Sequence, residues 1–381
     1  MTKKRSLPLR VGLIGCGNVS DAYFKHSKLF SNYIEIVACA SRTEAHAEAK
    51  AAEYGLSKGS TVKELLDDPE IDIVLNLTNP KAHAEVNLQA LRAGKHVYCE
   101  KPFATSYQEG LKVLKEAHKR KLRLACAPDT MLGGGFQTCR KLIDDGAIGK
   151  PIAATANFLN HGSEGWHPNP DFFYQPGGGP LFGAGPYYLS GLATLLGPAK
   201  NISAFAKTSF KERLITSQPL HGKKIKVNTP THLIGLVEFA QGPVATVTTS
   251  FDVWAHHAPM IEIYGTEGSI QCPDPNLFNG EILLWTLKTK EWRTVPLTHN
   301  DDMGRSLGLA DMALAIHESR PHRASVELAL HVVEIIEAFH VSARSGKKIA
   351  LKSTCRRPEA MPAGLGLGKL TSALKAATKQ R

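Results

Sequence analysis

The sequence predicts an α/β protein in two parts: a parallel sheet alternating with helices, followed by an α+β domain. Three observations lead to this prediction. Apolar runs alternate with helical patterns through residues 10–126, a glycine-rich turn follows the first run, and period-2 runs take over beyond residue 150. The chain has 381 residues, which is too long for one compact core, so two domains are expected.

The first part contains short apolar runs separated by amphipathic stretches. This alternation is typical of βαβ units and therefore of a parallel sheet. The runs are Val11–Ile14, Ile34–Ala40, Ile71–Leu77, His96–Cys99 and Leu122–Ala125, and the clearest helical stretches are Ala45–Tyr54, Ala82–Ala93 and Tyr107–Lys119. Two of these helices are preceded by the spacing of a capping box, Ser41 with Glu44 and Ser106 with Glu109.

The first apolar run leads into Gly15-Cys16-Gly17, a tight turn that opens a helix. Gly15 permits the turn, Gly17 lets the backbone approach a pyrophosphate, and Ser20 is small enough for helix–strand packing. The free N–H groups and the dipole of a helix N-terminus favour an anion. Glycine turns can also serve backbone geometry alone. In this context, however, the pattern predicts a Rossmann domain over residues 1–126 that binds a nicotinamide dinucleotide at Gly15, Gly17, Asn18 and Val19.

The residues after the second strand bear on the choice of cofactor. An Asp or Glu there would bind the ribose 2′-hydroxyl of NAD, and this sequence has Ser41 and Arg42 instead. Arg offers a charged fork to an oxyanion, so NADP(H) is favoured over NAD(H). The alternative is that Ser41 is a helix N-cap and Arg42 a solvated surface residue.

The second part is rich in period-2 runs, and turns such as Gln241–Pro243 imply antiparallel neighbours. The runs are Ile202–Lys207, His232–Phe239, Val244–Phe251, Ile261–Tyr264 and Ile282–Trp285, and two helices over Gly308–Glu318 and Arg323–Ala343 close the domain. Residues 162–186, rich in Gly, Pro and aromatics, are expected to form a loop. We place this substrate-binding and oligomerisation domain at 127–357 and a basic tail at 358–381, in which Pro362–Arg381 is an appended, dispensable segment.

Composition narrows the class of protein. Residues 1–10 carry four basic side chains and no acidic one, and residues 341–381 carry ten and one; from totals of 46 and 35, this leaves 32 basic and 34 acidic residues between them. The near-neutral body argues against a nucleic-acid partner. No apolar run approaches the ~20 residues of a membrane span, and no signal peptide is visible. The seven cysteines form no C-x-x-C pair, which favours reduced thiols and a cytoplasmic location.

Two segments resemble the Gfo/Idh/MocA oxidoreductase family: Leu77–His83, and Ala93–Pro102 with its Glu100-Lys101-Pro102 motif. Ile261–Ser269 extends the resemblance. It implies an open, mostly antiparallel sheet in the second domain that packs against another subunit, as in a homodimer or homotetramer. It also implies that Lys101 binds the reacting carbinol oxygen, where an ammonium stabilises a developing alkoxide. The resemblance places the following residues along the cofactor crevice: Thr78, Asn79, Pro80, His83, Glu100 and Lys101.

The sequence departs from the family at its second motif, a glycine run, an Asp and, four residues later, a His that acts as general acid/base. Here Gly183 takes the Asp position and Tyr187 the His position. A tyrosine there resembles a subgroup with a Trp166–Pro170 segment. Tyr187 is the first candidate for the base, His167 the second and His161 the third. The expected substrate contacts are Lys101, Asp129, Trp166, His167, Tyr187 and Tyr188.

Aromatic side chains of the loop, Tyr174 among them, either stack on a sugar ring or pack into a small core. His256 and His257 invite a metal site, but adjacent strand residues point to opposite faces, so no metal is expected.

The function predicted from these residues is hydride transfer between a nicotinamide and a secondary alcohol of a sugar, glycoside or cyclitol. One alternative is a non-catalytic, dinucleotide-dependent sensor or regulatory protein, which Gly183 and the basic tail favour. Another is redox-assisted glycoside cleavage. The intact Glu100-Lys101-Pro102 motif favours the dehydrogenase or reductase.

Overall fold

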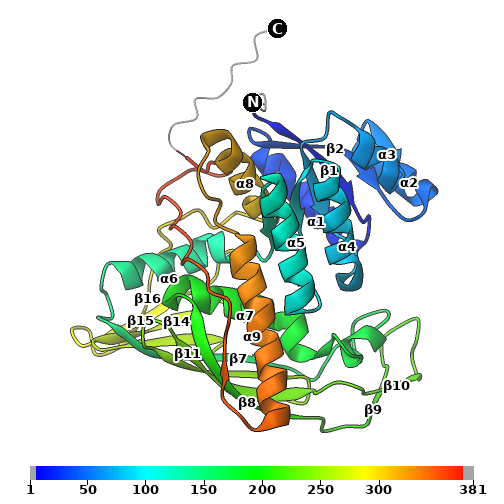
Figure 1. Ribbon diagram of the computed structural model, residues 1–381. Coiled ribbons are helices and arrows are strands. Elements are labelled where there is room, and N and C mark those ends of the chain that lie inside the picture. Colours follow the sequence, from blue (N-terminus) through cyan, green and yellow to red (C-terminus); the bar gives the residue numbers. More distant parts are fainter. Residues whose placement is uncertain (1–5, 372–381) are drawn as a thin grey trace. The chain divides into compact units, whose positions relative to one another are not determined.

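The structure is a computed structural model that describes residues 6–371 and divides into two compact units (Figure 1). Unit 1 comprises the chain up to Gln137, Leu297–Leu330 and the chain from Pro358, and unit 2 comprises Thr138–Pro296 and His331–Arg357. Residues 297–330 thus pack with the N-terminal part of the chain, although their sequence position is well inside the C-terminal half. The chain passes between the units four times: within α6 (Gly134–Asp144), after Pro296, within α9 (Val326–Ser345) and after Arg357.

Unit 1 is built on a parallel sheet with strand order β3-β2-β1-β4-β5-β6, which confirms the predicted Rossmann-like arrangement. Its central strands are buried on both faces, and they therefore read as continuous apolar runs rather than as alternating ones. The strands are β1 (Leu9–Ile14), β2 (Ile34–Ala40), β3 (Lys58–Ser60), β4 (Ile73–Asn76), β5 (His96–Cys99) and β6 (Leu124–Cys126).

The helices of unit 1 follow the strands along the chain, and α4 and α5 lie side by side (Figure 1). They are α1 (Asn18–Ser27), α2 (Glu44–Tyr54), α3 (Val62–Asp67), α4 (His83–Arg92), α5 (Tyr107–Arg120) and α8 (Leu307–Glu318). Ser106 caps α5 as predicted, but the Glu109 carboxylate bonds Thr105 instead of closing the box. The capping box predicted at Ser41 is wrong, because the N-cap of α2 is Thr43.

Unit 2 contains a mixed sheet with strand order β16-β15-β14-β13-β7-β12-β11-β8-β17 and a separate β9–β10 hairpin. Only the β7–β12 pairing in this sheet is parallel among the described residues, so the mostly antiparallel prediction is confirmed. The strands are β7 (Pro151–Leu159), β8 (Ala199–Lys207), β9 (Glu212–Leu214), β10 (Lys224–Lys226), β11 (His232–Phe239), β12 (Val244–Ser250), β13 (Ile261–Gly265), β14 (Gly268–Cys272), β15 (Leu283–Thr286), β16 (Trp292–Thr294) and β17 (Ile349–Ala350).

Two helices cover one face of this sheet. α7 (Gly179–Leu196) contacts β7, β11 and β12, and α9 is tied to β8 by a hydrogen bond from the Ala199 N–H to His331 Nε2. The start of α7 lies inside the segment predicted to be a loop, and that part of the prediction is wrong. Nearly every residue of α7 is buried, so tertiary packing outweighs the helix-breaking tendency of its glycines and of Pro186.

The opposite face of the sheet exposes apolar side chains at alternating positions. They lie on the neighbouring strands β12, β11 and β8: Val244, Ile234, Leu236 and Phe205. An apolar face of this kind on adjacent strands is typical of a surface that another protein covers.

The described part of the tail packs on unit 1. Leu370 is buried, and its backbone N–H donates to the hydroxyl of Tyr33 at 3.0 Å. The Met361 N–H donates to Gln137 Oε1 at 2.7 Å. The appended segment therefore packs on unit 1 as far as Thr371, its dispensability for folding and cofactor binding stays a prediction, and residues 372–381 lie outside the described range.

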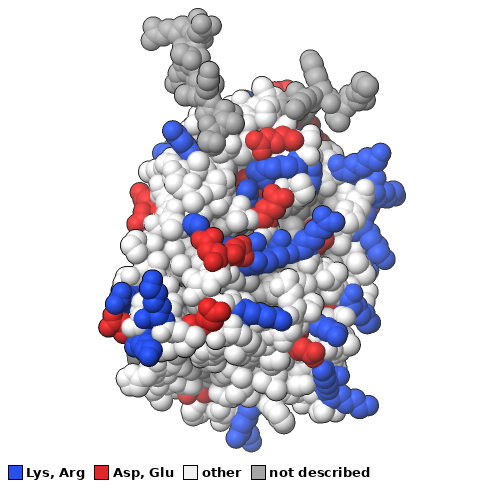
Figure 2. Space-filling view, turned by 90° about the vertical axis from the view of Figure 1, so that its left-hand side faces the viewer, with Lys and Arg blue, Asp and Glu red and all other residues white. Residues whose placement is uncertain are grey.

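The surface carries charges of both signs (Figure 2), and the cysteines lie inside the two units. Figure 2 shows acidic and basic side chains interspersed over the face in view, in keeping with the near-neutral body of the sequence. All seven cysteines are buried, with free thiols. Of the helices within residues 6–371, none has the length and apolarity to span a bilayer.

Candidate functional site

The turn between β1 and α1 has the geometry of a pyrophosphate cradle. Gly15 has φ +107°, and a Cβ there would lie 2.6 Å from the carbonyl carbon of Leu77, so only glycine fits. Gly17 is the N-cap of α1, and a Cβ built on it meets nothing within 4 Å. Ser20 is buried and donates to the Gly17 carbonyl at 2.6 Å. The N-terminus of α1 has no side-chain cap and the space beside Gly17 is open, which suits an anion.

The carboxyl end of β2 lies beside this turn, because Ala40 pairs in register with Ile14. Ser41 is half-buried and Arg42 is exposed, and neither side chain forms a hydrogen bond with any residue in the described range. Both side chains are therefore available to a ligand bound at the β1–α1 turn.

The carboxylate of Glu100 fixes the backbone of the proposed reactive lysine at the end of β5. Glu100 is buried, and its two oxygens accept hydrogen bonds from the Tyr23 hydroxyl (2.9 Å) and from the Lys101 N–H (2.8 Å). Burial, reinforced by the Glu100 charge, raises the pKa of Tyr23 well above its usual range, so Tyr23 stays a donor. Glu100 thus supports the backbone of Lys101, whose side chain is half-buried, and its contact with cofactor stays a prediction.

His83 joins the segment after β4 to the segment after β5. Its ring is buried, with Nδ1 2.7 Å from the Pro102 carbonyl and Nε2 2.8 Å from the Thr78 carbonyl. Both partners are acceptors, so an imidazolium satisfies both. Burial alone would lower the pKa of His83, but Cys99 and the two carbonyls raise it to about 9. His83 therefore holds these two segments together, while Asn79 is exposed and Pro80 is half-buried.

Asp129 is fully buried inside unit 1, in contrast to its predicted contact with substrate. Its carboxylate accepts a hydrogen bond from the Gly308 N–H at 3.1 Å and lies 3.7 Å from Arg305 Nη1. Burial raises the pKa of Asp129. These surroundings assign it to the packing of α8 and argue against direct substrate binding.

The second motif lies in unit 2 on α7. Gly183 and Tyr187 are four residues apart, so they share one face of the helix. A Cβ on Gly183 would be 4.0 Å from the Phe173 ring, an ordinary contact, so the helix has room for a side chain there. Tyr187 is 9% exposed. Its neighbour Tyr188 packs against Phe158, with ring centroids 5.9 Å apart. The packing of Tyr188 argues against a sugar-stacking role.

Trp166 and His167 occupy the loop before α7. Trp166 is 66% exposed, and His167 Nδ1 accepts a hydrogen bond from the Asn169 N–H at 3.0 Å. Burial lowers the pKa of His167, so the ring is neutral near neutral pH and carries its proton on Nε2. A neutral imidazole with one nitrogen left to exchange a proton suits a general acid/base.

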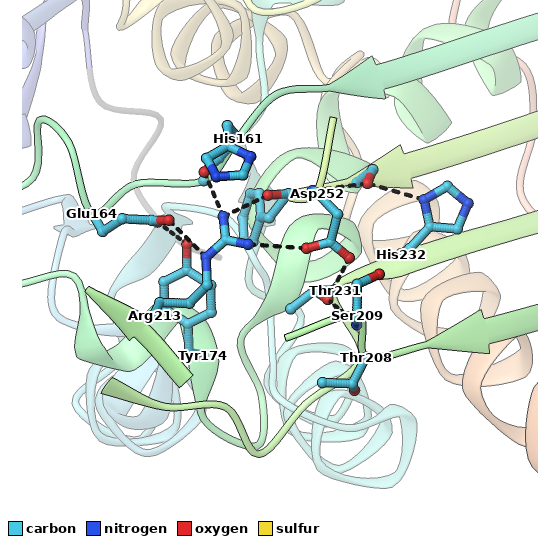
Figure 3. Close-up of polar contacts among 12 residues, drawn as sticks. His161, Glu164, Tyr174, Thr208, Ser209, Arg213, Thr231, His232 and Asp252 are labelled. Carbon is cyan, nitrogen blue, oxygen red and sulfur yellow. Dashed lines mark hydrogen bonds and ion pairs between the residues drawn. The ribbon is translucent and has the colours of Figure 1, made fainter. Parts of the chain in front are cut away.

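Tyr174 belongs to a small core, so of the two interpretations left open for it, stacking on a sugar is wrong. It packs fully buried with Ile215, Ile225 and Phe251. Its hydroxyl donates to Glu164, which is also paired with Arg213. This buried ionic cluster (Figure 3) was not predicted from the sequence, because an Arg in a strand is usually a solvated residue.

In the described part of the chain, no group of three or more His, Cys, Asp or Glu side chains could hold a metal ion. His256 and His257 are both exposed.

Comparison with known proteins finds two regions that match family models. Residues 9–127 match the oxidoreductase family with an NAD-binding Rossmann fold, and residues 136–271 match the GFO/IDH/MocA C-terminal domain. The chain is 26% identical over 360 residues to the D-glucoside 3-dehydrogenase of Escherichia coli, covering 91% of this chain and 98% of that protein. It is 26% identical to the levoglucosan dehydrogenase of Pseudarthrobacter phenanthrenivorans, with 69% and 73% covered.

Other relatives match over a shorter span. Two uncharacterised oxidoreductases of Schizosaccharomyces pombe are 27% and 28% identical, with matches that span 63% and 54% of their length. Among solved structures, a levoglucosan dehydrogenase in complex with NADH shares the fold at a TM-score of 0.78 and 23% identity, covering 91% of this chain and 99% of that one.

Proposed function

Since the chain belongs to the Gfo/Idh/MocA oxidoreductase family, we propose that it transfers a hydride between a nicotinamide cofactor and a secondary alcohol of a sugar, glycoside or cyclitol. The observation that carries the proposal is the support of Lys101 by the buried Glu100 carboxylate, at the same edge of the parallel sheet as the Gly15–Gly17 turn. The names of the relatives, a glucoside dehydrogenase and a levoglucosan dehydrogenase, favour a pyranose substrate.

The roles of the residues follow from their chemistry. When bound, the nicotinamide supplies the hydride acceptor or donor. The Lys101 ammonium stabilises negative charge on the carbinol oxygen. Tyr187 carries the proton, with His167 as the second candidate.

The cofactor preference rests on the end of β2. Ser41 and Arg42 offer a hydroxyl and a guanidinium where a carboxylate would bind a ribose 2′-hydroxyl, so the proposal names NADP(H) over NAD(H). Asn18 and Val19 at the start of α1 and the Thr78–Pro80 segment complete the proposed cofactor contacts.

The exposed apolar face of the large sheet supports a homo-oligomer. A homodimer or homotetramer would cover Phe205, Ile234 and Leu236, which water surrounds in a single chain.

A second candidate function has one observation in its favour. Gly183 lacks the carboxylate that usually supports the proton carrier, which suits a dinucleotide-dependent sensor. Redox-assisted glycoside cleavage is a third candidate, recognised by release of an aglycone without net reduction of cofactor.

One assay separates the first two candidates. Wild type and Lys101→Met are incubated with glucosides, levoglucosan and inositols, and the absorbance of reduced nicotinamide is followed with each cofactor. Turnover that Lys101→Met abolishes, with cofactor affinity retained, supports the oxidoreductase. Tight cofactor binding with no turnover on the whole panel would overturn it in favour of the sensor.

A further inference from the structure

A cavity of about 430 Å³ lies within unit 2, and of the residues considered above for hydride transfer only His161, the third candidate for the base, lines it. It opens between the segment after β7 and the β9 strand, with Trp254 at its rim. Its volume falls inside the range of about 300–1,000 Å³ that is usual for small-molecule sites.

The floor of the cavity is rigid, because its one buried cation is held from four sides (Figure 3). Arg213 Nε donates to Glu164 at 2.6 Å and Nη1 donates to Asp252 at 3.2 Å. Nη2 donates to the carbonyls of His161 (2.5 Å) and Phe251 (2.7 Å). The far oxygens of both carboxylates accept from hydroxyls. Side chains fixed in this way bind a ligand with little further loss of conformational entropy.

One wall of the cavity is aromatic. Trp254 is 81% exposed, and His161 stacks on it with ring centroids 3.3 Å apart and an interplanar angle of 15°. Phe210 meets His161 edge-on, and the Arg213 guanidinium lies over the Phe210 ring. Stacked rings that hold a tryptophan in place while leaving it this exposed offer a flat apolar platform to a ligand.

The charge around the cavity selects against anions. Among the residues that line it, the carboxylates are those of Glu164 and Glu212, and the one Lys or Arg is Arg213, which pairs with Glu164. Carboxylates therefore outnumber cations by one. A ligand that carries its own carboxylate or phosphate would meet like charge, whereas hydroxyl groups can donate to Glu164 and Glu212.

We propose that this cavity binds an uncharged hexopyranose unit, with the C–H face of the ring on Trp254 and its hydroxyls on Glu164, Glu212 and Thr216. A pyranose ring has an apolar C–H face bordered by hydroxyl groups, and the cavity offers an aromatic platform, Trp254, bordered by carboxylates. The proposal depends on the proposed function only for the choice of a carbohydrate; the binding itself requires neither cofactor nor turnover.

The test observes Trp254 directly. Full-length protein labelled with 5-fluorotryptophan has four fluorine resonances, one for each tryptophan, and Trp254→Phe assigns the relevant one. Methyl β-D-glucopyranoside and the matching methyl glucuronide are titrated separately, without cofactor. Trp292, which is 45% exposed on β16 outside the cavity, is the internal control.

We expect the neutral glycoside to shift the Trp254 resonance saturably, with the glucuronide binding about tenfold more weakly and the Trp292 resonance unmoved. Glu212→Gln, a change at an exposed position, should reduce the difference in affinity between the two glycosides. Lys101→Met should leave the response of Trp254 to the neutral glycoside unchanged. The last variant separates this site from the proposed reaction: loss of turnover with an intact Trp254 titration concerns only the reaction.

Three outcomes overturn the proposal: a Trp254 resonance that does not respond to the neutral glycoside, equal affinity for the glucuronide, or a shift that Lys101→Met abolishes. Light scattering supplies a fourth. If Trp254→Ala dissociates an oligomer, a second copy of the chain occupies the platform instead of a sugar.

Discussion

The carboxylate of Glu100 accepts a hydrogen bond from the backbone N–H of Lys101, its own neighbour in the chain, at 2.8 Å. The other oxygen accepts from Tyr23 on α1, so one buried carboxylate ties the reactive segment to the helix that begins at the dinucleotide turn. A glutamate side chain that folds back in this way fixes the backbone of its neighbour, the lysine that we propose binds the carbinol oxygen.

Glu100→Gln tests this arrangement. An amide has one acceptor oxygen for two donors, so one buried donor loses its acceptor, which costs about 1–3 kcal/mol of unfolding free energy. We expect kcat to fall about tenfold as Lys101 shifts. Tyr23→Phe is the matched control, because it removes the other hydrogen bond and keeps that of Lys101. If Tyr23→Phe lowers kcat as much, the Lys101 hydrogen bond is not the cause.

Arg42→Ala tests the cofactor. Wild type should bind NADPH more tightly than NADH in a fluorescence titration, because the guanidinium pairs with the 2′-phosphate. Arg42→Ala should remove about 1–3 kcal/mol of that preference and leave NADH affinity unchanged. An unchanged ratio, or tighter NADH binding by wild type, would show that Arg42 only faces solvent.

Tyr187→Phe removes only the hydroxyl proposed to carry the proton. General acid–base catalysis contributes on the order of 10²–10⁴ in rate, so kcat should fall by such a factor while cofactor affinity stays nearly constant. Normal turnover in this variant together with its loss in His167→Ala would move the role to His167. Gly183→Asp restores the family carboxylate at a position with room for it; increased activity would identify Gly183 as the limiting residue.

Truncation tests the docked part of the tail. A chain ending at Met361 should unfold at a lower temperature than wild type, and Leu370→Ala alone should cost about 2 kcal/mol. A chain ending at Thr371 is the control, because it keeps Leu370 on Tyr33. Equal melting temperatures for all of these chains would mean that the contact contributes nothing to stability.

His331 should make the stability of unit 2 depend on pH. Its Nε2 accepts from the Ala199 N–H and its Nδ1 lies 2.9 Å from Ser353 Oγ. Burial lowers the pKa of His331 to about 4. The unfolded chain, with a pKa of about 6.5, binds the proton first, so the contribution of His331 is complete above pH ~6.5 and is lost as the pH falls toward ~4. We expect the free energy of unfolding, measured in urea, to fall between pH ~6.5 and ~4 by roughly 3 kcal/mol more in wild type than in His331→Gln. Parallel curves for the two proteins would exclude this role.

The sequence predicted most of unit 1 because its signals are local. Gly15 must be glycine for steric reasons that the turn alone determines, and the buried strands appear as continuous apolar runs. α7 was missed at its start because Pro180, Gly183 and Pro186 oppose helix formation, and only contacts with β7, β11 and β12, distant in sequence, outweigh them. The burial of Tyr174 and Arg213 was not predicted either, because a residue type does not show whether a distant partner such as Glu164 lies within reach in the folded chain.

The burial of every native thiol makes the protein a convenient host for spectroscopic probes. Cys355, the most accessible of the seven, is only 7% exposed, so a maleimide dye should react selectively with a cysteine introduced on the surface. One such cysteine in each unit would accept a donor and an acceptor dye. Energy transfer between them would then report whether a dinucleotide or a glycoside changes the separation of the two units in solution.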